Sequence, residues 1–308
     1  MKRILVSGLI NVESTLKVNQ FPITYSPIEY AFFGIKTNVS GVAFNIAKAL
    51  GVLGDQVELA SLTGKDQEGI RINDEVEKIG VQHSLIYDSL AETPTSIVLF
   101  DQEGRRKIYC DLKDIQDQQY PVDKITDQLN KQDMVVLCNI NFNRPLLRKA
   151  KEYGALIATD VHVLSDIEDS YNKEFMENAD LLFLSDENIN GNHKEFVNQL
   201  KNRYNNRIIV LGQGKQGVLM YDRQINTFYK LPSVATGEVI NTVGAGDALF
   251  SAFIHYYTKG MEPLECLKRA EIFASLKIGY NGAATGFVTE QKVEKFYNKV
   301  TIPVEILT

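Results

Sequence analysis

Two glycines and an aspartate, placed directly before an apolar run, form the stretch of this sequence with the clearest chemical meaning. Gly244 and Gly246 flank Ala245, and the apolar residues from 248 to 254 continue with helical spacing, which predicts a loop leading into a buried helix. Glycines let successive N–H groups point into one concavity, and the start of a helix adds a positive dipole. We therefore expect an anion site at this loop.

Asp247 occupies the first turn of that predicted helix, where its carboxylate would lie beside the bound anion. A carboxylate would repel a bound phosphate. An aspartate in this place is therefore explained best if it takes the proton of an attacking hydroxyl group while backbone dipoles hold the transferred charge. This combination of residues is typical of phosphoryl transfer. The alternative is an ordinary loop whose aspartate caps a helix, because glycine and aspartate are both common in turns and caps.

Polar side chains also follow two predicted strands at their carboxyl ends. Asn11 and Glu13 come after the apolar strand at residues 2–8, and Asn139 follows the strand at residues 134–138. In open α/β sheets, ligands bind outside the carboxyl ends of the strands. These three residues are therefore candidate substrate contacts, and a turn cap is the alternative for Asn11.

A complete G-x-G-x-x-G pattern at residues 212–217 raises a different hypothesis, the binding of NAD by a dehydrogenase. That fingerprint requires a strand, the glycines and then a helix. Residues 207–211 are strand-like, but residues 218–221 form a second strand-like run where the helix should begin. We predict a glycine hairpin, in which no helix start can meet a pyrophosphate, and the dehydrogenase hypothesis is disfavoured.

Two motifs resemble the ribokinase-like (PfkB) family of sugar and nucleoside kinases. The stretch from Asn241 to Phe253 resembles the family's C-terminal signature, usually written D-T-x-G-A-G-D. Residues 40–47, Ser-Gly-Val-Ala-Phe-Asn-Ile-Ala, resemble its N-terminal motif G-G-x-x-x-N-x-A. Two motifs in the right order and at the right separation are more specific than either one, and the resemblance extends over nearly the whole chain.

The resemblance implies roles for the matching residues around the acceptor. Asp247 would be the catalytic base, and the backbone amides from residue 244 to 247 would hold the transferred group. Gly41 would contact the substrate by close backbone approach, and Asn45 would bind hydroxyl groups. Glu13 stands where the family has an aspartate that binds sugar hydroxyls. Ser40 replaces the first glycine of the motif, which points to an atypical substrate.

The resemblance further implies ATP as co-substrate, together with Mg²⁺. The residues at the matching ATP-binding positions are Ser185, Gly212, Gly214, Gly217, Thr242 and Asn281. Ser185 and Asn188 replace the family's N-x-x-E, which orders water around magnesium, so Asp186 and Glu187 become the metal candidates unless the nucleotide holds the ion. Asn241 replaces an aspartate that commonly helps to hold potassium, so K⁺ near Asn241 is an open expectation.

The elements that must position these residues alternate between strand-like and helix-like runs. Such alternation predicts an α/β fold with a doubly wound, mostly parallel sheet flanked by helices. The resemblance implies that residues 1–308 form a single ribokinase-like kinase domain. The predicted strands include residues 4–6, 57–62, 134–138, 155–160, 179–184 and 207–211, and the predicted helices include residues 41–53, 144–152, 248–257 and 264–278.

Two further stretches predict a small second sheet. Residues 16–36 are rich in aromatic residues and proline and are expected to form strands, and residues 93–110 read as a β-hairpin with its turn at 101–104. The resemblance implies a lid made of about residues 12–37 and 93–112, which would exclude water from the transferred phosphoryl group. The lid edge is a candidate for pairing with a second subunit in a homodimer.

Composition limits the partners of the chain. A net charge of −6 argues against a nucleic-acid partner, and no apolar run reaches the roughly 18 residues that span a bilayer. The three cysteines and four histidines are dispersed, without the spacing of a metal site or a disulfide framework. We expect buried thiols in a cytoplasmic protein whose partners are small molecules.

The resemblance therefore implies an ATP-dependent carbohydrate kinase that phosphorylates a hydroxymethyl group of a small sugar, as ribokinases and fructokinases do. The form I-N-x-x-G-A-G-D, together with the run from Cys138 to Asn141, is closer to pseudouridine-kinase-like members, so a nucleoside kinase is the alternative. A non-catalytic sensor of a sugar or nucleotide is a third hypothesis. The aspartate at position 247 speaks against it, because a sensor needs no base.

Overall fold

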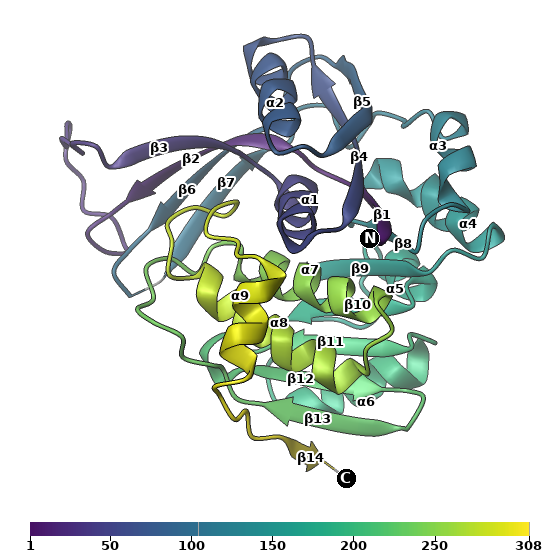
Figure 1. Cartoon of the computed structure of the whole chain (residues 1–308). Coiled ribbons are helices and arrows are strands. Elements are labelled where there is room, and N and C mark those ends of the chain that lie inside the picture. The colour runs from purple at the N-terminus through teal and green to yellow at the C-terminus, as the bar shows by residue number, and fades with distance from the viewer. Residues whose placement is uncertain (104, 308) are drawn as a thin grey trace.

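A large sheet and a small sheet organise the computed structural model, which describes residues 1–103 and 105–307 (Figure 1). Gly104 of the predicted hairpin turn and Thr308 lie outside the described residues. Within the described part of the chain, the large sheet has ten strands and the small sheet has four. The predicted α/β fold with a doubly wound, mostly parallel sheet is confirmed.

Neighbouring strands of the large sheet are parallel on one side and antiparallel on the other. All pairs from β11 through to β5 are parallel, and β12, β13 and β14 continue the sheet with antiparallel pairs. The strands in spatial order are β14 (Glu305–Leu307), β13 (Thr227–Leu231), β12 (Val218–Asp222), β11 (Ile208–Gly212), β10 (Leu181–Ser185), β9 (Ile157–Val163), β8 (Met134–Leu137), β1 (Arg3–Ser7), β4 (Gln56–Gly64) and β5 (Gln82–Leu90).

Helices cover both faces of this sheet, which explains why its central strands are continuous apolar runs. One face carries α1 (Val42–Leu53), α2 (Gln67–Lys78), α7 (Ala245–Thr258), α8 (Pro263–Lys277) and α9 (Glu290–Tyr297). The other carries α3 (Asp123–Leu129), α4 (Arg144–Glu152), α5 (Lys173–Asn178) and α6 (His193–Arg203). Helix α7 packs against both α1 and α8, and its residues from 248 to 256 are all buried.

The glycine-rich stretch at 212–217 forms a hairpin, as predicted. Strands β11 and β12 are antiparallel neighbours, and a short 3₁₀ helix, Gly214–Gln216, connects them. A second 3₁₀ helix, Asn141–Asn143, precedes α4. Because a strand follows the glycines, the dinucleotide fingerprint lacks the helix start that it requires.

The small sheet projects from one side of the large sheet (Figure 1). Its strands, in spatial order, are β3 (Ile35–Ser40), β2 (Asn11–Lys17), β6 (Thr95–Phe100) and β7 (Arg106–Asp111). The central pair, β2 and β6, is parallel, and the outer pairs are antiparallel. The stretches at 12–37 and 93–112 therefore supply nearly all of this sheet.

The prediction of strands across residues 16–36 was wrong for residues 18–34, which contain no strand. The aromatic rings of this segment are exposed, including Tyr25, Phe32 and Phe33. Aromatic residues favour strands because they pack on a half-buried pleated surface, and this segment has no such surface beneath it. Pro22 and Pro27 also lack the N–H group that a strand ladder needs.

Among residues 1–103 and 105–307, no helix is both long and apolar enough to span a bilayer.

Candidate active site

The amino end of α7 begins at a tightly packed glycine. Gly244 is the N-cap and has a φ of 79°, in the left-handed region. A Cβ at this position would lie 2.5 Å from the carbonyl oxygen of Ala283, so a side chain would collide with the neighbouring loop. The Ala245 N–H donates to the Thr242 carbonyl at 3.1 Å, whereas the N–H groups of Gly246 and Asp247 belong to the first helical turn, which has no preceding turn to bond. These amides suit an anion.

Asp247 is joined to α1 across the two halves of the chain. Asn45 Nδ2 donates a hydrogen bond of 2.7 Å to Asp247 Oδ2, although the residues are 202 positions apart in the sequence. Gly41 fixes the start of α1, since it has a φ of 101° and its Cβ would lie 2.5 Å from the Leu9 carbonyl oxygen. The close backbone approach expected of Gly41 is thus made to the segment between β1 and β2.

A group of polar side chains extends from Asn45 into the small sheet. The Ser40 hydroxyl lies 3.4 Å from Glu13 Oε2 and 3.4 Å from Asn45 Oδ1. Asn11 faces Ser40 across the β2–β3 pair and donates from Nδ2 to the Ser96 hydroxyl at 2.9 Å. Its Oδ1 atom is buried and has no hydrogen-bond partner among the described residues. These side chains together offer several groups that can bind hydroxyls.

Burial and nearby charges perturb the ionisable groups of this cluster. Burial raises the pKa of Asp247, and the charge of His162 and the hydrogen bond from Asn45 partly offset that effect. Burial also raises the pKa of Glu13, against the hydrogen bond from Ser40. Perturbed carboxylates that share one site are typical of catalytic centres.

Sequence reasoning missed three charged or ionisable residues near Asp247. Asp160 and His162 come from β9 and interact electrostatically with the Asp247 carboxylate. Lys277 is the last residue of α8 and is 1% exposed, and its ammonium donates a hydrogen bond to the Val243 carbonyl. The available signal for Lys277 was its position between the mostly apolar residues 272–276 and Ile278, because a lysine with apolar neighbours on both sides can be buried.

The predicted ATP-binding residues occupy two places in the fold. Ser185 and Gly212 are paired neighbours at the carboxyl ends of β10 and β11, and the other two glycines follow in the hairpin. Asn281 is linked to the loop before α7, because Asn241 Nδ2 donates to Asn281 Oδ1 at 2.8 Å. Thr242 follows Asn241 in that loop.

The metal candidates lie directly after β10. Glu187 forms an ion pair with Arg106 of β7, and Asp186 Oδ2 lies 3.7 Å from His193 Nε2. Among the described residues, no group of three or more His, Cys, Asp or Glu side chains could hold a metal ion. Mg²⁺ bound to a nucleotide needs only one or two protein carboxylates, because phosphates and waters supply the other ligands. A single carboxylate such as Asp186 or Glu187 would be enough for that role.

Asn139 makes different contacts from the other predicted residues. It follows β8, and its Nδ2 donates to Asn172 Oδ1 at 3.0 Å. The Tyr171 hydroxyl donates to its backbone carbonyl at 2.9 Å. The amide of Asn139 is thus engaged with the segment before α5, whereas Asn11, Glu13 and Asn45 gather near Asp247.

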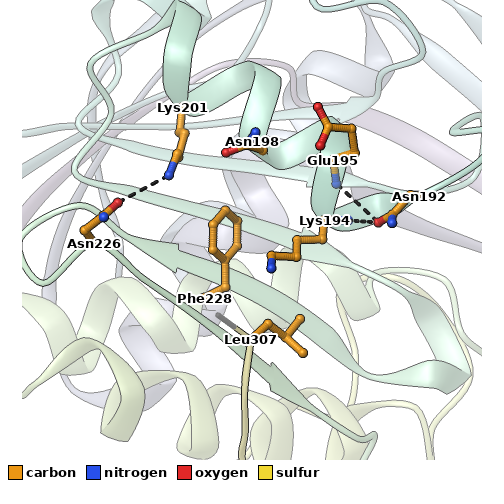
Figure 2. Close-up of a pocket in the computed structure, with 8 residues that line it drawn as sticks. All are labelled: Asn192, Lys194, Glu195, Asn198, Lys201, Asn226, Phe228 and Leu307. Carbon is orange, nitrogen blue, oxygen red and sulfur yellow. Dashed lines mark hydrogen bonds between the residues drawn. The ribbon is translucent and has the colours of Figure 1, made fainter.

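A surface pocket of ≈ 430 Å³ contains none of the predicted site residues (Figure 2). Lys194 and Lys201 of α6 lie over the ring of Phe228 on β13, and Leu307 of β14 closes one side. Lys201 also donates to Asn226 Oδ1 at 3.3 Å. The pocket is lined by α6 and the antiparallel edge of the large sheet, while the polar cluster is built from α1, α7 and the small sheet.

Comparisons with known proteins identify relatives over most of the chain. The chain is 24% identical to acarbose 7(IV)-phosphotransferase from an Actinoplanes species, over 87% of this chain and 89% of the relative. It is 22% identical to the bifunctional protein HldE of Campylobacter curvus over 84% of this chain, a match that spans only 58% of that longer protein. The solved structure of a microbiome-derived acarbose kinase, Mak1, superposes with a TM-score of 0.87 at 22% identity, over 96% of this chain and 98% of the other.

A family match extends over nearly the same length. Residues 1–290 match the pfkB family of carbohydrate kinases, and both motifs and the cluster around Asp247 lie within this range. The resemblance noted in the two motifs is therefore confirmed. This chain belongs to the pfkB carbohydrate kinase family of ATP-dependent kinases.

Proposed function

We propose that this protein transfers the γ-phosphoryl group of ATP to a hydroxymethyl group of a small sugar. The observation that carries the proposal is the position of Asp247, in the first turn of α7 and hydrogen-bonded to Asn45. A carboxylate in that place adjoins both an anion-binding helix start and side chains that can bind hydroxyl groups. Transfer to an alcohol requires these two features side by side.

Asp247 acts as the general base of the proposed reaction. Its carboxylate takes the proton of the acceptor hydroxyl, the acceptor oxygen bonds to the γ-phosphorus, and the bond from that phosphorus to the bridging oxygen breaks to release ADP. Burial raises the pKa of Asp247, which makes its carboxylate a stronger base than an exposed aspartate. The backbone amides of Gly244, Gly246 and Asp247 hold the charge on the transferred group.

The acceptor lies among the polar residues of the small sheet and α1. Glu13 and Asn45 accept or donate hydrogen bonds to its hydroxyl groups, and the buried Oδ1 atom of Asn11 gains the donor that it lacks. An acarbose phosphotransferase among the relatives supports a carbohydrate acceptor. Ser40 adds a hydroxyl between Glu13 and Asn45, so the pocket favours acceptors with neighbouring hydroxyl groups.

ATP binds over the carboxyl ends of β10 and β11 and the loops that contain Thr242 and Asn281. Ser185 and Gly212 are half-buried and Gly214 is exposed, so a nucleotide can approach the backbone there. Asp186 would help to hold Mg²⁺, which neutralises charge on the phosphates when it is bound. The paired Glu187 carboxylate contributes to a link with the small sheet instead.

The small sheet acts as a lid over the site. Val98 of β6 packs in one buried cluster with Val243 and Ala283, which joins the sheet to the loop before α7. Arg106 adds an ion pair to Glu187 at the end of β10. A sheet held at both places excludes water from the phosphoryl group.

A homodimer through the small sheet is part of the same proposal. β3 is an edge strand, and Ile35 on it is 60% exposed. Phe32 and Phe33, which precede it, are 83% and 93% exposed. Exposed apolar side chains along a sheet edge favour association with another copy.

The test is ADP formation from Mg-ATP across a panel of ribose, fructose, deoxygluconate-type sugars, adenosine, cytidine and pseudouridine. We expect turnover on a sugar, and turnover on nucleosides alone would replace the sugar with a nucleoside acceptor. Asp247→Asn should lower turnover about 10²–10⁴-fold, as expected for the loss of a general base. Glu305→Gln, on the exposed edge strand β14, is the matched control and should retain wild-type turnover. Wild-type turnover by a folded Asp247→Asn variant would refute the assignment.

A further inference from the structure

Lys277 is a buried cation beside the loop that starts α7. Its side chain is 1% exposed, although it lies at the carboxyl end of α8, where a lysine could readily reach solvent. A buried ammonium is costly unless it is paired and hydrogen-bonded. Its position therefore requires partners inside the protein.

The partners of Lys277 belong to the active site. The ammonium donates a hydrogen bond to the carbonyl of Val243, the residue before the N-cap Gly244. It also interacts electrostatically with the carboxylates of Asp247 and Glu13, and the positive charge of Arg106 acts in the opposite sense. Burial lowers the pKa of Lys277 to about 8, against the two carboxylates, so the group is mostly charged at neutral pH.

The hydrogen bond to Val243 also fixes a catalytic amide. The carbonyl of Val243 and the N–H of Gly244 belong to one planar peptide unit, so holding the carbonyl sets the direction of the N–H. That N–H is one of the three amides proposed to hold the transferred phosphoryl group. A positive charge at this carbonyl therefore controls the geometry of the anion site through the backbone.

The oxygens around Asn241 do not suit a potassium ion, which was an open expectation at this position because Asn241 replaces the family's aspartate. Such an ion needs several free oxygen ligands. Asn241 Oδ1 already accepts the N–H of Val243 at 2.9 Å, and Asn281 Oδ1 accepts from Asn241 Nδ2 at 2.8 Å. The Val243 carbonyl is bonded to Lys277. The side chain at position 241 also carries no negative charge.

We propose that the Lys277 ammonium is a tethered cation that replaces a monovalent metal ion and holds the Val243–Gly244 peptide in its catalytic orientation. Lys277 is a positioning residue, because its ammonium is bonded to the Val243 carbonyl and acts on the anion site through the backbone. The proposal rests on the phosphotransferase activity proposed above. Its consequence is a kinase whose activity does not depend on potassium.

The first experiment uses the wild-type protein alone. ADP formation is measured with Mg-ATP and the best acceptor of the panel, in tetramethylammonium, sodium or potassium chloride at equal ionic strength. We expect rates that agree within about twofold, and activation by potassium of about tenfold or more would overturn the proposal. A protein without kinase activity in any salt would refute the proposed function instead. In that case the thermal shift caused by Mg-ATP, measured in the same salts, tests the potassium independence, and a larger shift in potassium overturns it.

The second experiment removes the charge with Lys277→Met, which keeps the length of the side chain. Loss of a direct donor to an oxyanion site lowers kcat about 10²–10³-fold. Because Lys277 acts through the peptide and not on the transferred group, we expect a smaller fall in kcat, of about 10-fold to 10²-fold, with less change in the KM of the acceptor. Ammonium, methylammonium or potassium should restore part of kcat, because a free cation can occupy the vacated place. Lys292→Met, on the exposed side of α9, is the control and should behave as wild type in every salt.

A purely structural role for Lys277 predicts a different result. The variant would then lose thermal stability, and added cations would not restore kcat. That result, or an unchanged kcat in tetramethylammonium chloride, overturns the proposal. If Lys277→Met does not fold, Lys277→Arg retains the charge and should remain independent of potassium, and activation of that folded variant by potassium would also contradict the proposal.

Discussion

Gly244→Ala tests whether the backbone geometry at the start of α7 controls catalysis. The substitution forces alanine into a left-handed conformation with φ near 79°, which costs a residue with a Cβ about 1–2 kcal/mol. The new Cβ would also lie 2.5 Å from the Ala283 carbonyl oxygen and 3.0 Å from the Ala283 Cα, so one of the two loops must move. A displacement of about 1 Å at reacting groups costs about 10²-fold in rate, which equals about 2.7 kcal/mol of activation free energy.

Gly54→Ala is the control that has the backbone strain of Gly244→Ala without its steric collision. Gly54 caps α1 with a φ of 101°, but its added Cβ would meet no atom within 4 Å. Urea unfolding should show a loss of about 1–2 kcal/mol for Gly54→Ala with unchanged kcat/KM. Gly244→Ala should lose at least as much stability and, in addition, about 10²-fold of kcat/KM. A Gly244→Ala variant with wild-type kcat/KM would refute the argument that this loop positions the anion site.

Three further predictions address stability, the lid and assembly. Burial raises the pKa of Glu271 on α8 to about 8, above the ordinary glutamate value of 4.5, so the folded protein binds a proton that the unfolded chain releases between these values. Stability should therefore fall as pH rises from about 5 to about 8. The unfolding temperature of Glu271→Gln should fall less over this pH range than that of the wild type, and an equal fall in both proteins would contradict the prediction. Arg106→Ala should raise the KM of ATP severalfold, because the ion pair of Arg106 with Glu187 joins the small sheet to the end of β10, where ATP is proposed to bind. The unfolding free energy should change by less than about 1 kcal/mol, because this ion pair is partly exposed. Light scattering should show dimers for the wild type and monomers for Phe32→Ser with Phe33→Ser, and a wild-type monomer would end the dimer proposal.

The sequence predicted the large sheet and the Asp247 region well, for physical reasons. Parallel strands buried on both faces are continuous apolar runs, so β1, β8, β10 and β11 stood out. The two glycine motifs placed Gly41, Asn45 and Asp247 at the starts of α1 and α7, where the structure brings the last two into contact. Local sequence carries this information because helix starts depend on nearby residues.

The remaining parts depend on contacts between distant segments. The segment 18–34 is rich in aromatic residues, which favour strands, but most of their rings are exposed and do not pack against the rest of the protein. The side-chain amide of Asn139 donates a hydrogen bond to Asn172, which lies 33 positions later in the sequence, directly before α5. The proposed role of Lys277 follows only from its contact with the Val243 carbonyl and from the nearby carboxylates of Asp247 and Glu13. Such pairs become visible only after the chain is folded.

The hydrogen bond between Asn45 and Asp247 also has a consequence for biosynthesis. The residues proposed to bind the acceptor emerge early from the ribosome, whereas the proposed base lies 202 positions after Asn45 and emerges late. Contacts of long sequence separation form slowly, because closing the intervening chain costs entropy. A nascent chain that ends before α7 therefore contains the side chains proposed to bind the acceptor without the proposed base. Recovery of kinase activity is accordingly a stricter measure of complete folding than recovery of helical structure.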